Sequence, residues 1–143
     1  MHPRVIVLED DEDSRRILAM VLERRGYEVV SAAEPLICPL YTDLDTRCTH
    51  EFPCGDFLLS DNHMPRMTGL QFVARQKERG CKGAIRNKAI LSGTWDLQEL
   101  ETAARLGCKV FTKPYNLNDI YRWLMERRKK LPAGRKLTAI GDL

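Results

Sequence analysis

A run of four apolar residues that leads directly into acids is the strongest constraint on the fold of this chain. Residues 5–8 are Val-Ile-Val-Leu, and Glu9, Asp10 and Asp11 follow without a break. Short runs rich in β-branched residues are typical of strands buried on both faces, and such strands belong to parallel sheets covered by helices. In open α/β sheets, ligands bind beyond the carboxyl ends of the strands. These acids therefore stand where a binding site is expected.

A second run repeats this pattern. Residues 56–61 pass through Phe-Leu-Leu-Ser to Asp61, and the loop 62–65 follows. If the two strands are neighbours, Glu9, Asp10 and Asp61 converge. Two like charges about 5 Å apart repel by roughly 3 kcal/mol at an effective dielectric constant of about 20, so three carboxylates require a cation. Carboxylates, a loop carbonyl and water are ligands that suit Mg²⁺ or Mn²⁺.

The remaining pattern alternates strands with helices. Helical spacing of apolar residues, with Gly or Pro at the ends, predicts helices over 14–25, 69–79, 97–106 and 116–130. Apolar runs predict further strands over 27–32, 88–92 and 109–112. Acids after the first strand can also cap the next helix, for which Asp13 or Ser14 is the expected N-cap. Five strands alternating with helices predict an α/β fold, a doubly wound five-stranded parallel sheet with helices on both faces.

The segment 34–55 breaks this alternation, because it contains three prolines and three cysteines. It predicts only a short helix within 35–44, with Pro35 at the first helical position and Pro39 as an interruption.

Thiols and an imidazole gather in the same segment, at Cys38, Cys48, His50 and Cys54. Such a set could form a tetrahedral zinc site or hold an iron centre. Alternatively, the thiols pack as small apolar side chains, which is also the role expected of Cys81 and Cys108.

Four of the five predicted strands deliver polar side chains to one edge of the sheet: Glu9 and Asp10, Asp61, Ser92, and Lys113. A carboxylate such as Asp61 can act as the nucleophile toward a phosphoryl group. Mg²⁺ would neutralise charge on the phosphoryl oxygens, while Ser92 and Lys113 would donate hydrogen bonds to them. Singly, each residue has a simpler interpretation as a cap, a turn residue or a solvated charge. Together they favour a phosphoryl site.

Residues 4–131 resemble a receiver domain of two-component response regulators. The resemblance rests on Glu9-Asp10, on Asp61 with Met64-Pro65 and Gly69 after it, on Ser92, and on Lys113-Pro114. It implies a flavodoxin-like fold, and Mg²⁺-dependent transfer of a phosphoryl group to Asp61 from a sensor histidine kinase or a phosphotransfer protein. The family catalyses only its own phosphorylation and dephosphorylation, so the chain is not expected to be an enzyme otherwise.

The resemblance also implies particular residue roles. Asp10, Asp61 and the backbone carbonyl of His63 would bind Mg²⁺, with Glu9 completing the acidic set. Arg15 and Arg16 would lie on the helical face offered to the phosphodonor. The family often carries a switch aromatic where this chain has Val110 or Phe111.

The expected organisation is one receiver domain over 1–131, with an irregular insert at 34–55, and a short polar tail over 132–143 without an output domain. We expect a monomer or weak homodimer that carries a phosphorelay signal in the cytoplasm to a downstream protein partner. No apolar run is long enough to span a membrane, and no signal peptide is evident.

Several alternatives remain at this stage. The chain could be a phosphorylation-independent pseudo-receiver, or a metal- or redox-sensing module that uses the segment from Cys38 to Cys54. Phosphatases of the haloacid dehalogenase type also use a strand-end Asp, but they carry a second Asp where this chain has His63. Nucleic-acid binding is disfavoured, because the basic run 127–130 at a helix end is typical of a solvated face.

Overall fold

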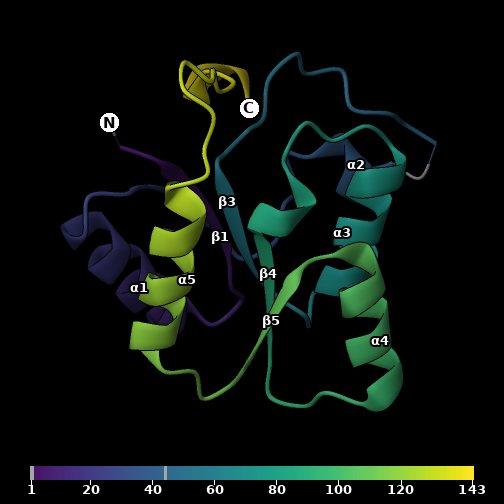
Figure 1. The fold of residues 1–143 in the computed structure, drawn as a ribbon. Coiled ribbons are helices and arrows are strands. Elements are labelled where there is room, and N and C mark those ends of the chain that lie inside the picture. Colours follow the sequence, from purple (N-terminus) through teal and green to yellow (C-terminus); the bar gives the residue numbers. More distant parts are fainter. Residues whose placement is uncertain (1, 44) are drawn as a thin grey trace.

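The structure is a computed structural model that describes residues 2–43 and 45–143. Its five strands form one parallel sheet in the order β2-β1-β3-β4-β5 (Figure 1). The strands are β1 Arg4–Leu8, β2 Glu28–Ala32, β3 Phe57–Asp61, β4 Lys88–Ser92 and β5 Lys109–Thr112. This order makes β1 and β3 neighbours, as the convergence of their acids requires. The predicted doubly wound parallel sheet is therefore confirmed.

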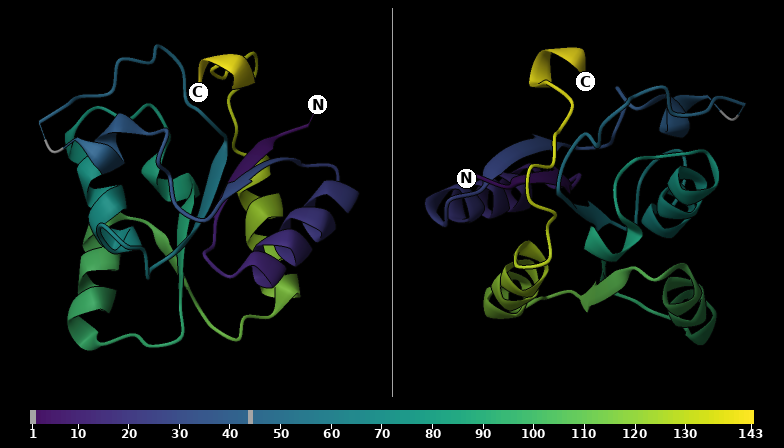
Figure 2. Two further views of the ribbon diagram at one scale, coloured as in Figure 1. Left: turned by 180° about the vertical axis from the view of Figure 1, so that it is seen from behind. Right: turned by 45° about the horizontal axis from the view of Figure 1, so that its top comes forward.

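Helices cover both faces of the sheet (Figure 1, Figure 2). The helices α1 Glu12–Arg24 and α5 Leu117–Arg128 lie on one side, and α2 Pro39–Thr42, α3 Gly69–Glu78 and α4 Leu97–Leu106 lie on the other. Alternate strand residues enter two separate apolar cores. Val5 and Val7 pack with α1 and α5, whereas Leu8 and Leu58 pack with α2, α3 and α4. This alternation is the two-residue period of a strand buried on both faces.

Side chains at the helix starts fix where the helices begin. Asp11, rather than the predicted Asp13 or Ser14, is the N-cap of α1, because its carboxylate accepts a hydrogen bond from the Ser14 backbone N–H at 2.9 Å. The helix starts two residues earlier than predicted, which brings Glu12 and Asp13 to its positive end. Thr68 caps α3 as predicted and forms a reciprocal pair with Gln71.

The helix predicted within 35–44 is reduced to the four residues of α2. Pro39 does not interrupt this helix but occupies its first position, where its missing N–H costs nothing. Cys38 before it is extended, as the residue preceding a proline prefers. The end of the predicted helix at Leu44 lies outside the described residues. A short 3₁₀ helix, Ile85–Asn87, precedes β4, and another, Ile140–Asp142, lies close to the C-terminus.

Residues 132–143 pack against the segment before β3 (Figure 2). The Thr138 backbone N–H donates to the Pro53 carbonyl at 2.8 Å, and its hydroxyl donates to the Phe52 carbonyl at 2.7 Å. Arg135 pairs with the buried Asp56, with Nη2 and Oδ2 2.8 Å apart. The guanidinium of Arg4, on β1, donates to the carbonyls of Cys54 and Thr138. The chain end is thus fastened to the amino-terminal edge of the sheet.

Candidate functional site

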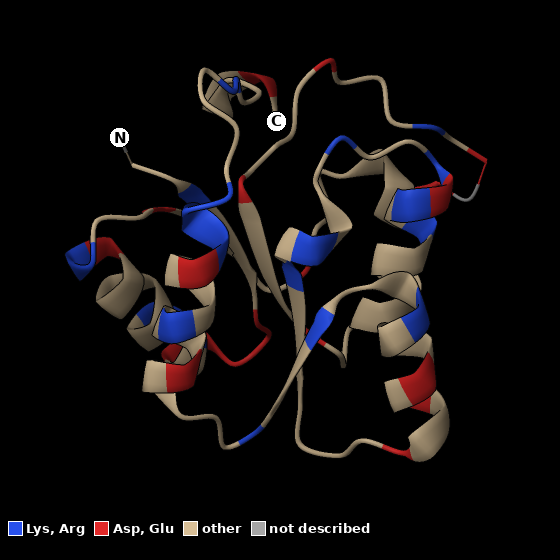
Figure 3. Ribbon diagram, viewed as in Figure 1, with Lys and Arg blue, Asp and Glu red and all other residues tan. Residues whose placement is uncertain are grey.

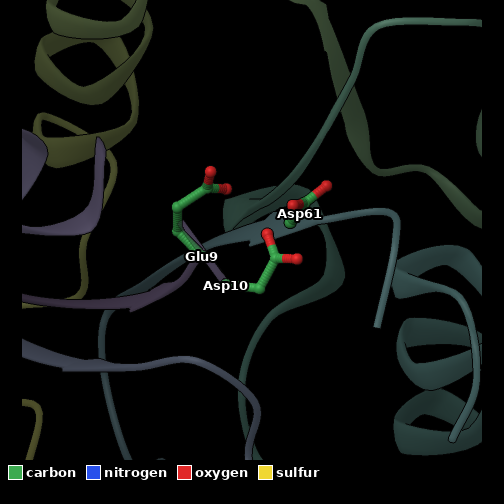
Figure 4. Close-up of side chains that lie close together, drawn as sticks. All are labelled: Glu9, Asp10 and Asp61. Carbon is green, nitrogen blue, oxygen red and sulfur yellow. The ribbon is translucent and has the colours of Figure 1, made fainter. Parts of the chain in front are cut away.

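Three carboxylates meet at the carboxyl ends of β1 and β3. Oxygen atoms of Glu9, Asp10 and Asp61 all lie within 4.8 Å of one another (Figure 4). Glu9 and Asp61 are each only 4% exposed, whereas Asp10 is exposed to solvent. Figure 3 shows the loop after β1 as an acidic stretch. The predicted convergence is therefore present, and it offers a solvent-accessible set of hard oxygen ligands suited to a divalent cation.

Lys113, at the end of β5, is the cation that faces these acids. Its Nζ lies 3.0 Å from Glu9 Oε2 and 3.3 Å from Asp61 Oδ2. Partial burial alone would lower the pKa of the Lys113 ammonium, but the hydrogen bond with Glu9 and the charges of both acids raise it. Lys113 is therefore positively charged at neutral pH and compensates part of the negative charge of the cluster.

Glu9 is more deeply buried than its charge favours. Burial raises the pKa of the Glu9 carboxyl, and the neighbouring Asp61 charge raises it further, while the hydrogen bond from Lys113 opposes both. Burial is the larger of the two effects that raise this pKa, and the repulsion from Asp61 adds to it. A second cation at this site would relieve that repulsion.

Ser92 lies at the end of β4 and is fully buried. Its hydroxyl donates to the Thr94 carbonyl at 2.9 Å rather than to a carboxylate of the cluster. Trp95, which follows Thr94, donates its indole N–H to the Phe111 carbonyl at 3.2 Å and so joins the loop after β4 to β5. Register places Ser92 one residue beyond the β4 partner of Asp61. Ser92 is therefore at the predicted edge of the sheet, with its donor engaged by its own loop.

The loop after Asp61 is held by contacts that the sequence did not indicate. The His63 backbone N–H donates to Asp61 Oδ1 at 3.1 Å, which fixes the side chain of Asp61. The buried Asn62 accepts from the Leu70 N–H through its side-chain oxygen and donates to Glu99 of α4. These bonds connect the starts of α3 and α4 to the loop that carries Asp61. The available sequence signal for this role was an Asn directly after the strand-end Asp61, in the loop before a helix.

Gly69 permits the close approach of α3 to this loop. A Cβ at this position would lie 2.7 Å from the Asp61 backbone oxygen and 3.2 Å from the Asn62 Cα. Distances below 3.0 Å to backbone atoms cannot be relieved by a side-chain rotation. Gly69 therefore sets the position of Asp61 through sterics.

Gly69→Ala is expected to displace the Asp61 loop. Forcing an extra methyl group into a packed site costs about 1–3 kcal/mol, so the free energy of unfolding should fall by that amount. Urea denaturation followed by circular dichroism measures the change. Gly141→Ala is the matched control, since a Cβ there meets nothing within 4 Å. Equal stability of the Gly69 and Gly141 variants would contradict the steric role of Gly69.

Comparison with known proteins identifies the family to which this arrangement belongs. The family model for the response regulator receiver domain matches residues 5–124. The chain belongs to the response regulator receiver domain family. The matched range contains the three acids, Ser92 and Lys113, so the receiver domain includes the whole candidate site.

A curated relative and several solved structures resemble this receiver domain. The chain is 36% identical over 75 residues to protein-glutamate methylesterase/protein-glutamine glutaminase 1 of Anaeromyxobacter dehalogenans (strain 2CP-C). That match covers 52% of this chain and 19% of the relative, so the chain spans about a fifth of the relative's length.

Two structures illustrate the shared fold. Chemotaxis protein CheY4 of Vibrio cholerae is 23% identical with a TM-score of 0.65, and the match covers 88% of this chain and 98% of that one. The receiver domain of the Francisella response regulator 1452 is 17% identical with a TM-score of 0.68, covering 91% and 100%. At these identities the likeness concerns the fold alone. The predicted flavodoxin-like architecture of receivers is confirmed.

The structure also places the other residues that the resemblance implied. Arg15 and Arg16 both lie on α1. Arg15 is partly buried and donates to the Glu9 carbonyl at 2.8 Å, whereas Arg16 is exposed and pairs with Glu12. Phe111 is buried in the core beneath α5, and Val110 faces the opposite core. In the described parts of the receiver domain, no helix has both the length and the apolar character needed to cross a membrane.

The cysteine segment does not form the metal site considered from the sequence. Within residues 2–43 and 45–143, Glu9, Asp10 and Asp61 are the only cluster of three or more His, Cys, Asp or Glu whose ligand atoms come together as a metal site requires. The predicted zinc or iron site is therefore not supported, and all five cysteines are free thiols. The thiols and the imidazole are close in sequence, but among the described residues their ligand atoms do not come together as a metal site requires.

Two of the thiols are expected to react slowly because partial burial disfavours their thiolate form. Burial raises the pKa of Cys38 above its usual value, and it raises the pKa of Cys54 from 9.0 to about 11. At pH 8 the Cys54 thiolate fraction is then about 100-fold lower than in the unfolded chain, and the thiolate is the reactive form.

Iodoacetamide alkylation at pH 8, quantified by peptide mass spectrometry, should therefore label Cys54 about 100-fold more slowly in native protein than in urea. The native rate should continue to rise toward pH 11, whereas the unfolded rate levels off above pH 9. A native rate within a few-fold of the urea rate at pH 8 would contradict the burial of this thiol.

Proposed function

We propose that this receiver domain accepts a phosphoryl group on Asp61 from a sensor histidine kinase or a phosphotransfer protein, and thereby changes its binding to a downstream protein partner. The proposal rests on one observation. The Asp61 carboxylate lies within 4.8 Å of two further acids and 3.3 Å from the Lys113 ammonium, at the carboxyl edge of a parallel sheet.

Mg²⁺, or Mn²⁺ in its place, suits the oxygen ligands of this site. Asp10 and Asp61 would hold the ion together with the backbone carbonyl of His63, and Glu9 would contribute negative charge from beside Lys113. The exposed side of Asp10 leaves the ion accessible to solvent and to an incoming phosphodonor. When bound, the ion neutralises charge on the phosphoryl oxygens.

Within this site, Asp61 is the nucleophile and other residues of the chain stabilise the phosphoryl group during transfer. An Asp61 carboxylate oxygen forms the new bond to phosphorus while the bond from phosphorus to the donor histidine nitrogen breaks, and the leaving imidazole takes up a proton. Lys113 and the Ser92 hydroxyl are the available donors to the phosphoryl oxygens. For Ser92 this requires the hydroxyl to release the Thr94 carbonyl.

Such a domain transmits a signal rather than converting a substrate. Apart from its own phosphorylation and the hydrolysis of its acyl phosphate, we propose no catalytic activity. The proposed receiver extends over 1–131, and residues 132–143 form the tail that packs on the segment before β3. The kinase or phosphotransfer protein would approach Asp61 over α1, where Arg15 and Arg16 lie.

Intact-mass spectrometry after incubation with acetyl phosphate, a small phosphodonor, tests the proposal. A single phosphoryl gain that appears with Mg²⁺ and disappears with excess EDTA supports it. If neither acetyl phosphate nor a panel of autophosphorylated histidine kinases and phosphotransfer proteins produces a gain, the chain is a phosphorylation-independent pseudo-receiver and the proposal is wrong.

Lys113→Ala is expected to leave labelling possible but to weaken the response to it. Loss of one preorganised donor to a reacting oxygen lowers rates by about 100-fold, so labelling should be slower and still reach completion. Chemical-shift changes on phosphorylation should spread over fewer residues, because the ammonium that links the phosphoryl group to β5 is absent. Lys109→Ala, on the same strand, is the control. Unchanged rate and unchanged shifts in Lys113→Ala would contradict the role of Lys113.

A further inference from the structure

A cavity of about 560 Å³ lies on the face of the sheet opposite α1 and α5. It is lined by residues of β1, of its neighbour β2 at the sheet edge, and of the segment 34–55, in which α2 has only four residues. Cavities of about 300–1,000 Å³ are typical of small-molecule sites. None of the three acids of the phosphoryl site lines it. It is therefore a separate feature of the molecule.

The walls of this cavity are largely apolar. Ile6, Leu8 and Val30 contribute from the strands, and four thiols contribute from the surrounding segments: Cys38, Cys48, Cys54 and Cys81. Burial raises the pKa values of Cys38 and Cys54, so these thiols are uncharged at neutral pH. Leu36 and Ile37 also line the cavity although they are 54% and 67% exposed, which places them where it meets solvent. Such walls fit an apolar body.

One buried charge interrupts the apolar lining. Lys88, the first residue of β4, is 5% exposed and lines the cavity. Its Nζ donates to Gln76 Oε1 at 2.8 Å and to Cys81 Sγ at 3.4 Å, and neither acceptor is a carboxylate. Among the described residues, no carboxylate lies within 4.0 Å of this ammonium. A buried charge without a counter-ion is costly, and an ammonium has three donors, so an anion is the missing partner.

The fold holds Lys88 in this position. Register pairs it with Leu58 of β3, whose side chain belongs to the same core beneath α2, α3 and α4. Gly83 leaves room for the lysine, because a Cβ there would lie 3.2 Å from Lys88 Cε and 3.5 Å from Nζ.

The acids that line the cavity are already engaged elsewhere. Glu34 accepts from the Tyr41 hydroxyl at 2.6 Å, and Asp56 pairs with Arg135 and accepts from the Arg4 N–H. Lys88 is the only Lys or Arg among the described residues of the lining. Lys88 is thus the cationic side chain that an anionic ligand would meet inside.

We infer that this cavity binds a small amphipathic carboxylate, whose carboxylate accepts from Lys88 Nζ and whose acyl chain or aromatic body lies along the apolar walls. A single carboxylate matches the single buried ammonium. The uncharged thiols and the strand side chains match an uncharged body. The inference is independent of phosphorylation at Asp61.

Isothermal titration calorimetry with decanoate, decanol and decylamine tests the charge selectivity on the unmodified protein. Decanoate should bind at least tenfold more tightly than decylamine, because only an anion compensates Lys88. Octanoate should bind about 15-fold more weakly than decanoate, since each buried methylene contributes about fourfold in affinity. A 2-naphthoate titration distinguishes a ring from a chain as the body. Equal binding of decanoate and decylamine, or binding of none of these probes, would overturn the inference.

Lys88→Met tests the named residue, since it keeps the length of the side chain and removes only the charge. Decanoate affinity should fall at least tenfold, which is the loss expected for a hydrogen bond to a charged group. Decanol affinity should stay the same or increase. Lys82 is exposed in the loop before β4, and Lys82→Met should change the affinity for neither decanoate nor decanol. If decanoate binds equally to Lys88→Met and wild type, the assignment of Lys88 is wrong. The wild-type ligand series decides the question even if the Lys88 variant fails to fold.

Discussion

Replacing Asp61 with asparagine is expected to abolish phosphoryl labelling completely. An amide oxygen is a much weaker nucleophile than a carboxylate, and it cannot form an acyl phosphate without losing the amide nitrogen. The substitution preserves shape, and the carboxamide oxygen can still accept from the His63 N–H. It also removes one charge from a crowded acidic cluster, so the variant should be at least as stable as wild type. Intact-mass spectrometry with acetyl phosphate and Mg²⁺ measures labelling, and urea denaturation confirms the fold.

The matched control for this experiment is Asp13→Asn, an exposed acid in the first turn of α1. It should be labelled at the wild-type rate. Normal labelling of a folded Asp61→Asn protein would mean that another residue accepts the phosphoryl group, and the site assignment would then be wrong.

Replacing Asp56 with alanine is expected to reduce the free energy of unfolding by about 3–5 kcal/mol, the usual cost of breaking a buried ion pair by removing one partner. The Asp56 side chain is only 2% exposed. It accepts from the Arg4 N–H at 2.8 Å and from Arg135 Nη2 at 2.8 Å. Its removal leaves a buried backbone donor and a mostly buried guanidinium without this acceptor. Residues 132–143 should then detach from the sheet edge.

Urea denaturation measures this loss, and hydrogen exchange of the Thr138 amide reports on detachment of the tail. Asp56→Asn keeps an oxygen for the Arg4 N–H, so its free energy of unfolding should fall less than that of Asp56→Ala. Asp142→Ala, an exposed acid in the tail, should lose no more than about 0.5 kcal/mol. A loss below about 1 kcal/mol in Asp56→Ala would show that the tail contributes little to stability.

The parts of the fold that the sequence predicted well are those defined by local signals. The strands at 88–92 and 109–112 and the helix at 97–106 match the structure at both ends. In the helix, Asp96 and Glu99 form a capping pair, and Gly107 adopts a left-handed conformation at the C-terminus. The convergence of Glu9, Asp10 and Asp61 was also predictable, because parallel strands bring their carboxyl ends to one edge.

The parts that were not predicted depend on partners distant in sequence. Lys113 was expected at the edge that carries the acids, but its ion pair with Glu9 across 104 residues was not predicted, nor was that of Arg135 with Asp56 across 79. Composition indicated a polar tail, but Thr138 is held by the backbone carbonyls of Phe52 and Pro53 in the segment before β3. The cysteine segment failed as a metal site for a related reason, since ligand spacing within a proline-rich segment does not determine the path of the backbone. The charge of Lys88 had no local pattern to distinguish it from a solvated lysine.

The hydrogen bond between Trp95 and β5 gives this molecule an optical probe of its own. Only two tryptophans are present. The ring centroid of Trp123 lies in the core, 6.2 Å from that of Phe57 and 6.0 Å from that of Phe111. A Trp123→Phe variant would therefore leave one indole, three residues after Ser92. Emission from that indole depends on its hydrogen bond and its contact with solvent. A single-tryptophan protein would thus report in real time, without any attached dye, whether the loop after β4 moves when ions or phosphodonors are added.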